Sequence, residues 1–458
     1  MLTVKQCTEL PIAGTVDVLV VGGGPAGVAA AFSAARLGAE TLVVEQFNCL
    51  GGVATAGGHG HICLYSAYCE RTRVVGGIPY EMGQRVAGAG YGVCTTSSVD
   101  FEVEGLKRVL EQMAEACRCR LLYHTFFCEA VVEEGRIVGA VIQNKGGRQW
   151  IRARRVVDCS GDGDVAASAG CAFAVGDEQT GLCQPVTLMF TIGGVDWDRV
   201  RAWRTSYGMR EVWELAQRRG DMRPFQKTIM GFWWTPTRPD QVGINFTHIN
   251  NVEATSAEHL TRATIEGRRQ AFECIPLFRK YVPGMERCFL VSTPHTVGIR
   301  ESRRVAGDYT LTRDDLVEQR HWADTVGYGS FFIDIHNTQG PGMDRKTWEP
   351  PPGFKYAIPY RILLPRGIEN LLVAGRCASC THEALGSLRV MPQCGVMGEA
   401  AGTAAVLSLE RDAAPRGLDP ARLQAQLRAQ GCLLDERDIE TAREQDAARP
   451  ASPAEDQP

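Results

Sequence analysis

The sequence has no long uninterrupted hydrophobic run, no excess of basic residues and no visible secretion signal. No apolar stretch approaches about 18 residues without a charge or a turn residue, so no membrane span is expected. The formal net charge of the 458 residues is −4, which disfavours nucleic acid or an anionic membrane surface as a partner. Residues 1–14 carry no apolar core like that of a signal peptide, so a cytoplasmic location is predicted.

Cysteine, by contrast, is abundant, with 17 residues, but its spacing does not indicate a metal centre. Cys377 and Cys380 form a single C-x-x-C, and no second pair follows at the spacing of a zinc site. Two free thiols lining a loop are a simpler interpretation than a redox pair. His59 and His61, two residues apart on a glycine-rich loop, are poor metal ligands without partners, so no metal is predicted.

The most informative segment is residues 17–45, which read DVLVVGGGPAGVAAAFSAARLGAETLVVE. The apolar run Val18–Val21 predicts a buried strand, and Val28–Leu37 predicts a helix of small residues that ends at Gly38. Thr41–Val44 predicts a second buried strand. The segment therefore predicts the opening strand–helix–strand unit of a parallel α/β sheet.

The turn between the first strand and the helix is a G-x-G-x-x-G, whose residues are Gly22, Gly23, Gly24, Pro25, Ala26 and Gly27. Gly22 permits the tight turn, Gly24 lets the backbone approach a pyrophosphate, and Gly27 lets the helix pack closely on the strand. Free N–H groups at the helix start hold phosphate charge. Glu45 lies 23 residues after Gly22 and is placed to accept hydrogen bonds from ribose hydroxyls, so a dinucleotide site is predicted.

Shorter elements are predicted between residues 49 and 161. The loop over 49–61, with Gly51 and Gly52, has few charges and permits close approach of a flat ligand. A helix is predicted over 100–117, with Asp100 as its N-cap. Strands are predicted over Leu121–Phe127, Ala130–Val132, Ile137–Ile142 and Gln149–Val157. They predict a three-stranded meander and then a strand that returns to the parallel sheet and ends at Ser160 and Gly161.

The rest of the chain divides by composition. Residues 176–360 hold seven of the eight tryptophans and show little strand–helix alternation, which predicts an inserted α+β substrate or cap domain. Residues 14–175 and 361–435 are predicted to form one discontinuous cofactor-binding domain, with a contribution from 60–100 left open. Asn370–Arg376 predicts its last strand, Cys394–Leu409 a helix of small residues, and 420–430 an amphipathic helix. Residues 441–458 have almost no apolar content and are predicted to be disordered.

Several segments together carry a family resemblance. They are VLVVGGGPAGVAAAFSAARLGAETLVVE, LGGVATAGG, VVDCSGDGDVAASAG, VGIRESRRVAGDYTLTRDDL, IDIHNTQG and LLVAGRCASCTHEALGSLRVMPQCGVMGEAAGTAA. The chain resembles the FAD-dependent oxidoreductases of the glutathione-reductase-like superfamily, in the branch that includes fumarate reductase flavoproteins. The resemblance implies a Rossmann-like domain, built from a parallel sheet and a three-stranded β-meander, that binds FAD rather than NAD.

The resemblance also implies positions for the cofactor. Gly22, Gly24 and Gly27, with Pro25 and Ala26, would face the pyrophosphate, and Glu45 would face the adenosine ribose. Gly51 and Gly52 would lie beside the pyrophosphate and the flavin. Ser160 and Gly161 would lie near the adenosine, and Gly375 and Arg376 would flank the phosphate-ribityl region. Gln46, Phe127 and Met397 complete the predicted contacts. A helix starting near Gly395–Gly398 would direct its N–H groups at the flavin pyrimidine ring, where reduced flavin carries negative charge.

A second G-x-G-x-x-G after a strand is absent from the sequence, so a nicotinamide domain of the disulfide-reductase kind is not predicted. The electron partner is left open between a bound substrate, oxygen, a quinone and another protein. Arg376 stands where the aromatic hydroxylase branch usually has an aspartate, which disfavours a monooxygenase. The C-x-x-C lies late in the chain, which disfavours thiol–disulfide chemistry.

The predicted activity is transfer of a hydride between flavin N5 and a small organic substrate bound between the two domains. His382 is predicted to handle the proton, and Arg389 or Arg300 to hold an anionic group. A polar network bracing the loop is the alternative for His382, and an ion-pair network is the alternative for Arg300. His336 is interpreted as a core histidine, and FAD is expected to be non-covalent, with a covalent link through His59 as an alternative.

Two other functions stay open at this point. One is a flavoenzyme without net redox chemistry, such as a lyase or isomerase. The other is an electron-relay subunit that needs a partner chain. The sequence does not decide whether the protein is a homodimer, and it does not name the substrate.

Overall fold

The computed structural model describes residues 9–206, 209–226 and 231–448. Its largest sheet has the strand order β6-β2-β1-β9-β8-β7, with β18 also paired to β9. These strands are β1 (Ile12–Val21), β2 (Thr41–Val44), β6 (Arg120–Leu122), β7 (Phe126–Glu133), β8 (Arg136–Asn144), β9 (Gly147–Asp158) and β18 (Leu371–Val373). β6, β2, β1, β9 and β18 run parallel, which confirms the predicted mixed α/β fold with a Rossmann-like core.

The sequence predicted a meander followed by a separate returning strand. The structure differs, because β9 is both the last strand of the meander and the strand that returns to the parallel sheet. Its first half pairs antiparallel with β8, from Gly147 to Arg152. Its last residues, Val156 to Asp158, pair parallel with β18 instead. The other edge of β9 pairs parallel with β1 from Trp150 to Asp158. One twelve-residue strand therefore joins the antiparallel ribbon to the parallel sheet, and it places residues 159–161 at the cofactor edge.

Two helices cover one face of this sheet. They are α1 (Pro25–Arg36) and α10 (Met391–Leu409), which share a hydrophobic core with Val18 and Val20 of β1. A Cβ atom at Gly398 would overlap the carbonyl oxygen of Ala26, and one at Gly402 would overlap that of Ala30. Only glycine permits this approach, so the small residues of α10 serve helix packing.

The predicted start of this helix near Gly395–Gly398 is wrong, because α10 begins at Met391 with Pro392 in its first turn. The amide groups available at the helix end are therefore those near Met391. Gly395 packs against Pro79, and Met397 is fully buried in the core. Contacts of these residues with FAD stay predictions.

Smaller elements surround the main sheet and share its core or flank it. They are η1 (Gly52–Ala54), β3 (His61–Cys63), α2 (Gly77–Gly88), β4 (Gly92–Cys94), β5 (Ser98–Phe101), α3 (Val103–Ala116), α4 (Asp164–Ser168), β10 (Phe173–Val175), β15 (Arg303–Val305), α8 (Arg313–Val317), β16 (Thr325–Gly329), β17 (Tyr356–Pro359), η2 (Tyr360–Leu363), α9 (His382–Leu388), η3 (Pro415–Gly417), α11 (Pro420–Ala429) and α12 (Glu436–Ala447).

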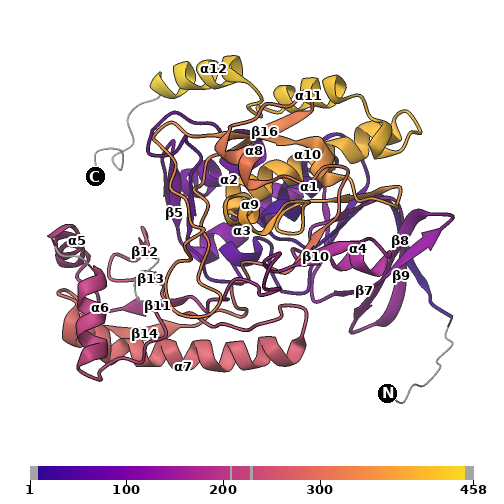
Figure 1. Cartoon of the computed structure of the whole chain (residues 1–458). Coiled ribbons are helices and arrows are strands. Elements are labelled where there is room, and N and C mark those ends of the chain that lie inside the picture. The colour runs from indigo at the N-terminus through magenta and orange to yellow at the C-terminus, as the bar shows by residue number, and fades with distance from the viewer. Residues whose placement is uncertain (1–8, 207–208, 227–230, 449–458) are drawn as a thin grey trace.

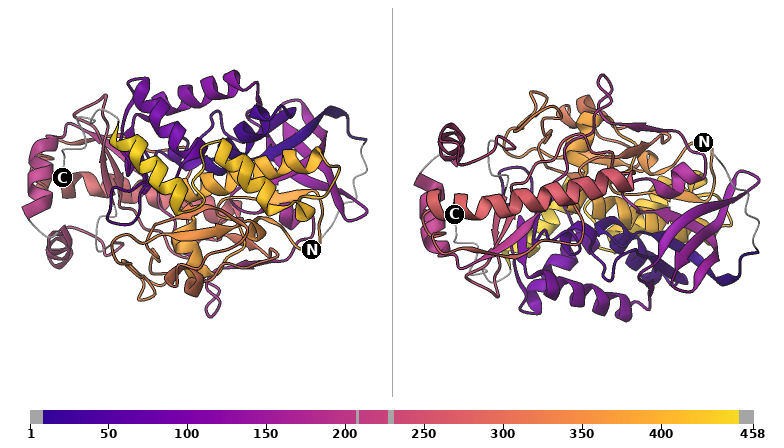
Figure 2. Two further views of the ribbon diagram at one scale, coloured as in Figure 1. Left: turned by 90° about the horizontal axis from the view of Figure 1, so that it is seen from above. Right: turned by 90° about the horizontal axis from the view of Figure 1, so that it is seen from below.

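A second hydrophobic core lies within residues 190–290. Its antiparallel sheet has the order β12-β13-β11-β14. The elements are β11 (Phe190–Gly193), α5 (Trp197–Ser206), α6 (Met209–Arg218), β12 (Gly231–Trp234), β13 (Val242–Asn245), α7 (Ala257–Tyr281) and β14 (Phe289–Ser292). Trp213, Phe246 and Phe278 form its centre. Figures 1 and 2 show α7 along one side of the molecule, opposite α11 and α12.

Residues of β16, β17 and η2 belong to the first core, with α1 and α10, although the predicted inserted domain ran to residue 360. The packing therefore favours an earlier return to the cofactor-binding part, near β15. The domain boundaries themselves stay a prediction.

Two local predictions are corrected. Asp100 is not a helix cap, because α3 begins at Val103 with Glu102 as its N-cap, and the Asp100 carboxylate instead contacts His61 Nδ1 at 2.6 Å. The predicted disordered tail began at residue 441, but residues 441–447 belong to α12. An ion pair of 2.8 Å between buried Arg73 and Asp446 fixes this helix. Residues 449–458 lie outside the described residues.

Among the described residues, none of the helices combines the length and apolar character that a membrane crossing requires.

One buried acid in α10 gives a prediction about stability. The Glu399 carboxylate accepts a hydrogen bond from Ile78 N at 2.8 Å through Oε2, and Oε1 has no partner among the described residues. Burial raises the pKa of this carboxyl to about 8. An unfolded glutamate titrates near about 4.3, so stability from the neutral folded form is complete below that pH and is lost as pH rises through 8.

We therefore expect Glu399→Gln, which is neutral at every pH, to gain stability over the wild type by about 3 kcal/mol between pH 5 and pH 8. Melting temperatures of both proteins across this range measure the effect. Glu440→Gln on exposed α12 is the matched control and should show no such trend. A difference that does not change with pH would contradict the assignment.

Candidate functional site

The carboxyl ends of the parallel strands meet at one edge of the sheet and are tied together there by backbone hydrogen bonds. Gly22 N donates to Val44 O at 2.8 Å, Cys159 N to Val21 O at 2.9 Å, and Ala374 N to Asp158 O at 3.0 Å. The loops that follow β1, β2, β9 and β18 therefore start side by side. Ligands of open α/β sheets bind in this position.

Two glycine turns face each other at this edge. Gly22 has a φ of +96°, and Gly51 and Gly52 have φ values of +104° and +53°, which favour glycine. A Cβ atom on Gly52 would lie 2.9 Å from Gly24 Cα. The first turn of α1 and the loop after β2 thus pack glycine against glycine, and we call this place the cradle. Free N–H groups at such a helix start can hold a pyrophosphate.

Glu45 closes one end of this cradle. Its carboxylate accepts hydrogen bonds from Gly23 N at 2.6 Å and from Phe47 N at 2.8 Å. Burial raises its pKa, although these two backbone donors oppose the shift. The acid therefore stands beside the glycine turn, as predicted, and its contact with a ribose stays a prediction.

The loop after β9 is held by its own side chains. The buried Asp158 carboxylate accepts from Ser160 N, Ser160 Oγ and Ala166 N at 3.1, 2.7 and 3.0 Å. Ser160 Oγ in turn accepts from Asp164 N at 3.0 Å. The hydroxyl of Ser160 is therefore used in hydrogen bonds that hold the loop. A contact of Ser160 with the adenosine stays a prediction.

Arg376 lies across this loop from the end of β18. Its Nη2 is 3.0 Å from Asp162 Oδ1, and Ser302 Oγ donates to the same carboxylate at 2.6 Å. A Cβ atom on Gly161 would lie 2.6 Å from the Arg376 guanidinium. The predicted pair Gly161 and Arg376 is thus brought together, and residue 302 joins it to the segment that carries Arg300.

The remaining predicted cofactor residues differ in exposure. Gln46 is exposed beside Glu45, and Phe127 on β7 is partly buried against the core of the main sheet. Gly375 has a φ of +92° and lies against Ala26, so it too belongs to the cradle. The glycine cradle, the adjacent acid and the helix start fit FAD at this edge.

A second polar group of residues lies beside the cradle. We call it the Arg300 cluster, and its members are His59, His248, Arg300, Asp334, His336 and Arg389. Arg389 Nη2 is 2.7 Å from Asp334 Oδ2, and His336 Nε2 is 3.4 Å from Asp334 Oδ1. The rings of His248 and His336 are 5.9 Å apart between centroids. The predicted residues Arg300 and Arg389 are therefore brought together by this cluster.

Arg300 is buried without an ion-pair partner among the described residues. Its one hydrogen bond there runs from Nη1 to Pro185 O at 2.7 Å. Burial and the positive charge of Arg389 lower its pKa to about 9, and Asp334 compensates only in part. A buried guanidinium without a counter-charge is costly unless an anion joins it.

Several buried polar atoms of the same region also lack partners among the described residues. They are His59 Nδ1, Gln184 Nε2, His336 Nδ1 and Arg389 Nε. Asp334 Oδ1 also has no hydrogen bond there, and it has only the 3.4 Å ion-pair contact with His336 Nε2. Nearly all buried polar atoms in native proteins are hydrogen-bonded, so such a concentration indicates a place for a polar ligand or water. The sequence interpretation of His336 as a satisfied core histidine is thus wrong in one respect, because it is buried but not satisfied.

The three imidazoles of the cluster are neutral at physiological pH. Burial, with the charge of Arg300, lowers the pKa of His336 to about 4. Burial and the neighbouring His336 and Arg300 lower that of His248 to about 3. Burial and the neighbouring His61 lower that of His59 to about 3. The cluster therefore carries net positive charge, from two arginines and one aspartate.

The cluster lies where residues 190–290 contact the cofactor-binding part. The His59 ring stacks on Trp233 of β12, with centroids 4.6 Å apart. His295 N donates to Ala56 O at 3.0 Å, and Arg238 pairs with Glu102 at 2.9 Å. These contacts hold the second sheet over the glycine loop that follows β2.

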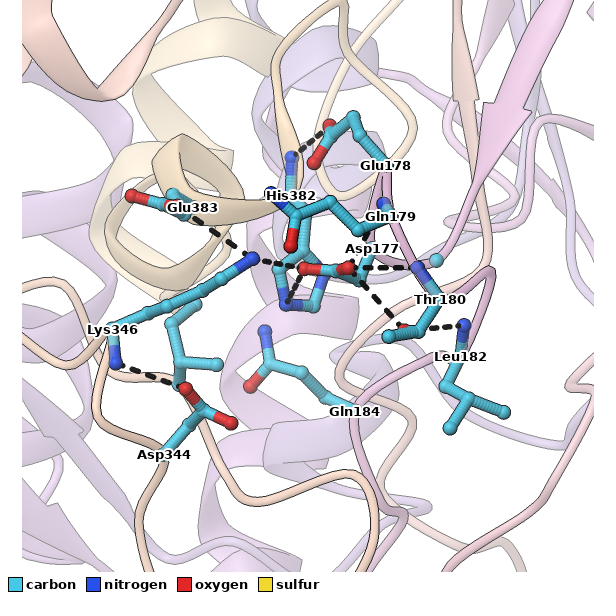
Figure 3. A network of polar contacts seen from close by, with 12 residues as sticks. Asp177, Glu178, Gln179, Thr180, Leu182, Gln184, Asp344, Lys346, His382 and Glu383 are labelled. Carbon is cyan, nitrogen blue, oxygen red and sulfur yellow. Dashed lines mark hydrogen bonds and ion pairs between the residues drawn. The ribbon is translucent and has the colours of Figure 1, made fainter.

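His382 belongs to an adjoining network rather than to the cluster itself. Its Nδ1 lies 2.9 Å from Glu301 Oε1, and its backbone N–H donates to Glu178 Oε1 at 2.8 Å. Figure 3 shows Lys346 reaching Asp177 and Glu383, which join the same network from separate segments. Arg304 forms a buried ion pair with Glu301. The structure thus places His382 in a bracing network, the alternative left open by the sequence.

Residues 300–304 connect all of these features. Arg300 enters the cluster, Glu301 holds His382, and Ser302 binds Asp162 beside the cradle. Arg303 pairs with Asp164 at 2.9 Å. A ligand at Arg300 would therefore lie next to the strand edge that carries the glycine turns.

The parallel sheet and the glycine cradle define the class as a dinucleotide-binding α/β protein. A family model described as FAD dependent oxidoreductase matches residues 17–427, and the chain belongs to this family. It is therefore an FAD-dependent oxidoreductase, and the predicted cofactor, FAD, is confirmed.

The matches between this chain and curated relatives cover only part of each relative's length. Thiamine thiazole synthase of Aeropyrum pernix is 34% identical over 127 residues, 28% of this chain and 43% of the relative. Digeranylgeranylglycerophospholipid reductase 2 of Methanopyrus kandleri is 30% identical over 165 residues, 34% of this chain and 40% of the relative. The chain thus spans less than half of these two relatives.

A solved structure of a geranylgeranyl bacteriochlorophyll reductase-like protein from Thermoplasma acidophilum is also similar. It is 15% identical, with a TM-score of 0.46 over 95% of this chain and 88% of that chain.

Proposed function

We propose that this enzyme transfers a hydride between FAD and a small organic anion bound at the Arg300 cluster. The observation that carries the proposal is the buried Arg300 guanidinium, which has no ion-pair partner among the described residues and lies among polar atoms without hydrogen bonds. An anion would neutralise the charge and supply hydrogen-bond partners at once. Arg389, already paired with Asp334, would line the same space.

The chain would hold FAD with the glycine turns at Gly22–Gly27 and Gly51–Gly52, with Glu45 near the ribose. Gly375 and Arg376 would lie along the middle of the cofactor. Bound FAD supplies a two-electron acceptor or donor for a hydride at its N5. The continuity of residues 300–304 between cluster and cradle supports substrate binding beside it.

FAD is proposed to be bound without a covalent link. The His59 ring is stacked on Trp233 and faces the cluster, which favours a role there over attachment. Acid precipitation of the purified protein should release all flavin to the supernatant. Flavin that stays with the pellet would instead support attachment, and His59→Ala would then identify the site.

The glutathione-reductase-like superfamily and the inserted substrate domain, predicted over 176–360, are also proposed. The packing of β16 and β17 in the first core favours an end of this domain near residue 300. A core of its own in residues 190–290 supports such an insertion.

The test is anaerobic addition of small carboxylates bearing a hydroxyl or amino group to the holoenzyme. Bleaching of the flavin absorbance by one of them would support the proposal and identify a substrate. If a compound binds but changes the redox state of neither oxidised nor reduced flavin, the result would favour the non-redox alternative. Reduction that needs a co-purified protein would favour the relay subunit.

A further inference from the structure

We propose that His336, oriented by Asp334, transfers the proton that accompanies hydride transfer at the Arg300 cluster, an inference that rests on the function proposed above. His336 would be a catalytic residue and Asp334 a positioning residue. The sequence favoured His382 for this task.

His336 is held once at its backbone and once at its imidazole ring. Its backbone N–H donates to Gln184 Oε1 at 3.2 Å, which fixes the main chain. Its Nε2 faces Asp334 Oδ1 at 3.4 Å, and Asp334 is itself held by Arg389 at 2.7 Å. A carboxylate beside Nε2 favours the tautomer with the proton on that nitrogen. Nδ1 is then a free lone pair.

This Nδ1 atom is buried and has no partner among the described residues. It therefore has the arrangement of a general base whose second nitrogen rests on a carboxylate, with Arg300 as a neighbouring charge. A substrate anion held by Arg300 would bring its reacting carbon and heteroatom into the same enclosed space.

Other histidines fit the role less well. His382 Nδ1 is already engaged by Glu301 at 2.9 Å. His248 has contacts at both nitrogens, with Gly340 O at 2.9 Å and Gln226 Nε2 at 3.3 Å. His59 has a free Nδ1, but it stacks on Trp233 and has no ion pair with a carboxylate among the described residues.

The proton balance is simple for oxidation of an alcohol or amine. The C–H bond would break and its hydrogen would leave with both bonding electrons, as the hydride that bound FAD accepts. The O–H or N–H bond would break as well, and its proton would move to His336 Nδ1. The electron pair of that second bond closes the C=O or C=N double bond. Asp334 stabilises the imidazolium that forms, and reduction of a carbonyl reverses each transfer.

The charges that face His336 make this transfer testable without the substrate. Arg300 and Arg389 disfavour the imidazolium, Asp334 favours it, and His248 is a neutral neighbour. A bound carboxylate cancels part of the positive charge and raises the proton affinity of His336 by about one to three pH units. Anion binding should therefore draw a proton from solution.

The experiment measures acetate binding to the holoenzyme by calorimetry at pH 5.5, in two buffers of different ionisation enthalpy. The wild type should take up about 0.2 to 0.9 proton per acetate, the range that a rise of one to three pH units gives at this pH. His336→Gln should still bind acetate but lose most of this uptake, and exposed His321→Gln should behave as the wild type. Undiminished uptake in His336→Gln would overturn the assignment and point to His59 or His248.

Two further results separate this inference from the proposed function. If acetate does not bind to the wild type, the anion site itself is refuted, and both proposals fail with it. If His336→Gln does not fold, ¹⁵N-histidine spectra of the wild-type holoenzyme give the answer directly. They should show one neutral imidazole with its proton on Nε2 that becomes doubly protonated on acetate addition, and a proton on Nδ1 at the start would refute the inference.

Discussion

Replacement of Gly24 by tryptophan is expected to give a folded, colourless protein. A Cβ atom at this position meets only Gly52 Cα, at 4.0 Å, so the fold accepts a first side-chain atom. A larger side chain would extend into the cradle between the two glycine turns, where a pyrophosphate needs direct backbone contact. FAD content, from the visible spectrum of the purified variant, should fall from near one per chain to near zero.

Two variants make this result specific. Gly24→Ala should fold normally and bind FAD at least about tenfold more weakly, because one methyl group enters the cradle. Gly38→Ala lies in the same strand–helix–strand unit, where a Cβ atom meets nothing within 4 Å, and should keep its flavin. Its φ of +88° makes a small loss of stability the expected side effect. A yellow Gly24→Trp protein with an unchanged spectrum would refute the cofactor position.

The cradle could be predicted from the sequence because it is local. Gly22, the helix and Glu45 lie within one strand–helix–strand unit, so their spacing fixes their neighbourhood. The double role of β9 was missed because its parallel partner β18 lies more than two hundred positions later in the chain. The start of α10 was misplaced because its glycines reflect packing on α1 rather than the helix end.

The candidate site was predicted only in part, because its chemistry depends on which side chains contact one another in the fold. The segment RESRR does not reveal which arginine is neutralised, since the carboxylates that pair with Arg303 and Arg304, those of Asp164 and Glu178, come from elsewhere in the chain. His336 alternates with apolar residues and resembled a core position. One signal was available, because Asp334 and His336 are two residues apart in an extended segment and so point to the same side.

Replacement of Arg300 by methionine is expected to abolish anion binding without weakening the fold. The guanidinium has one hydrogen bond and no ion pair among the described residues, so its removal leaves no carboxylate unpaired. Acetate affinity should fall by at least about 30-fold, the cost of losing one buried charged partner. Turnover of a substrate found by the anaerobic screen should fall at least as much.

The matched control is Arg304→Met, four residues further along the same segment. Arg304 pairs with buried Glu301 and donates to Gly176 O and Cys380 O, so its loss strands a buried carboxylate and should destabilise the protein by about 3–5 kcal/mol. Melting temperatures should thus stay level or rise in Arg300→Met and drop in Arg304→Met. Equal losses of stability in the two variants would show that Arg300 is a structural residue, and the anion site would have to be sought elsewhere along the flavin edge.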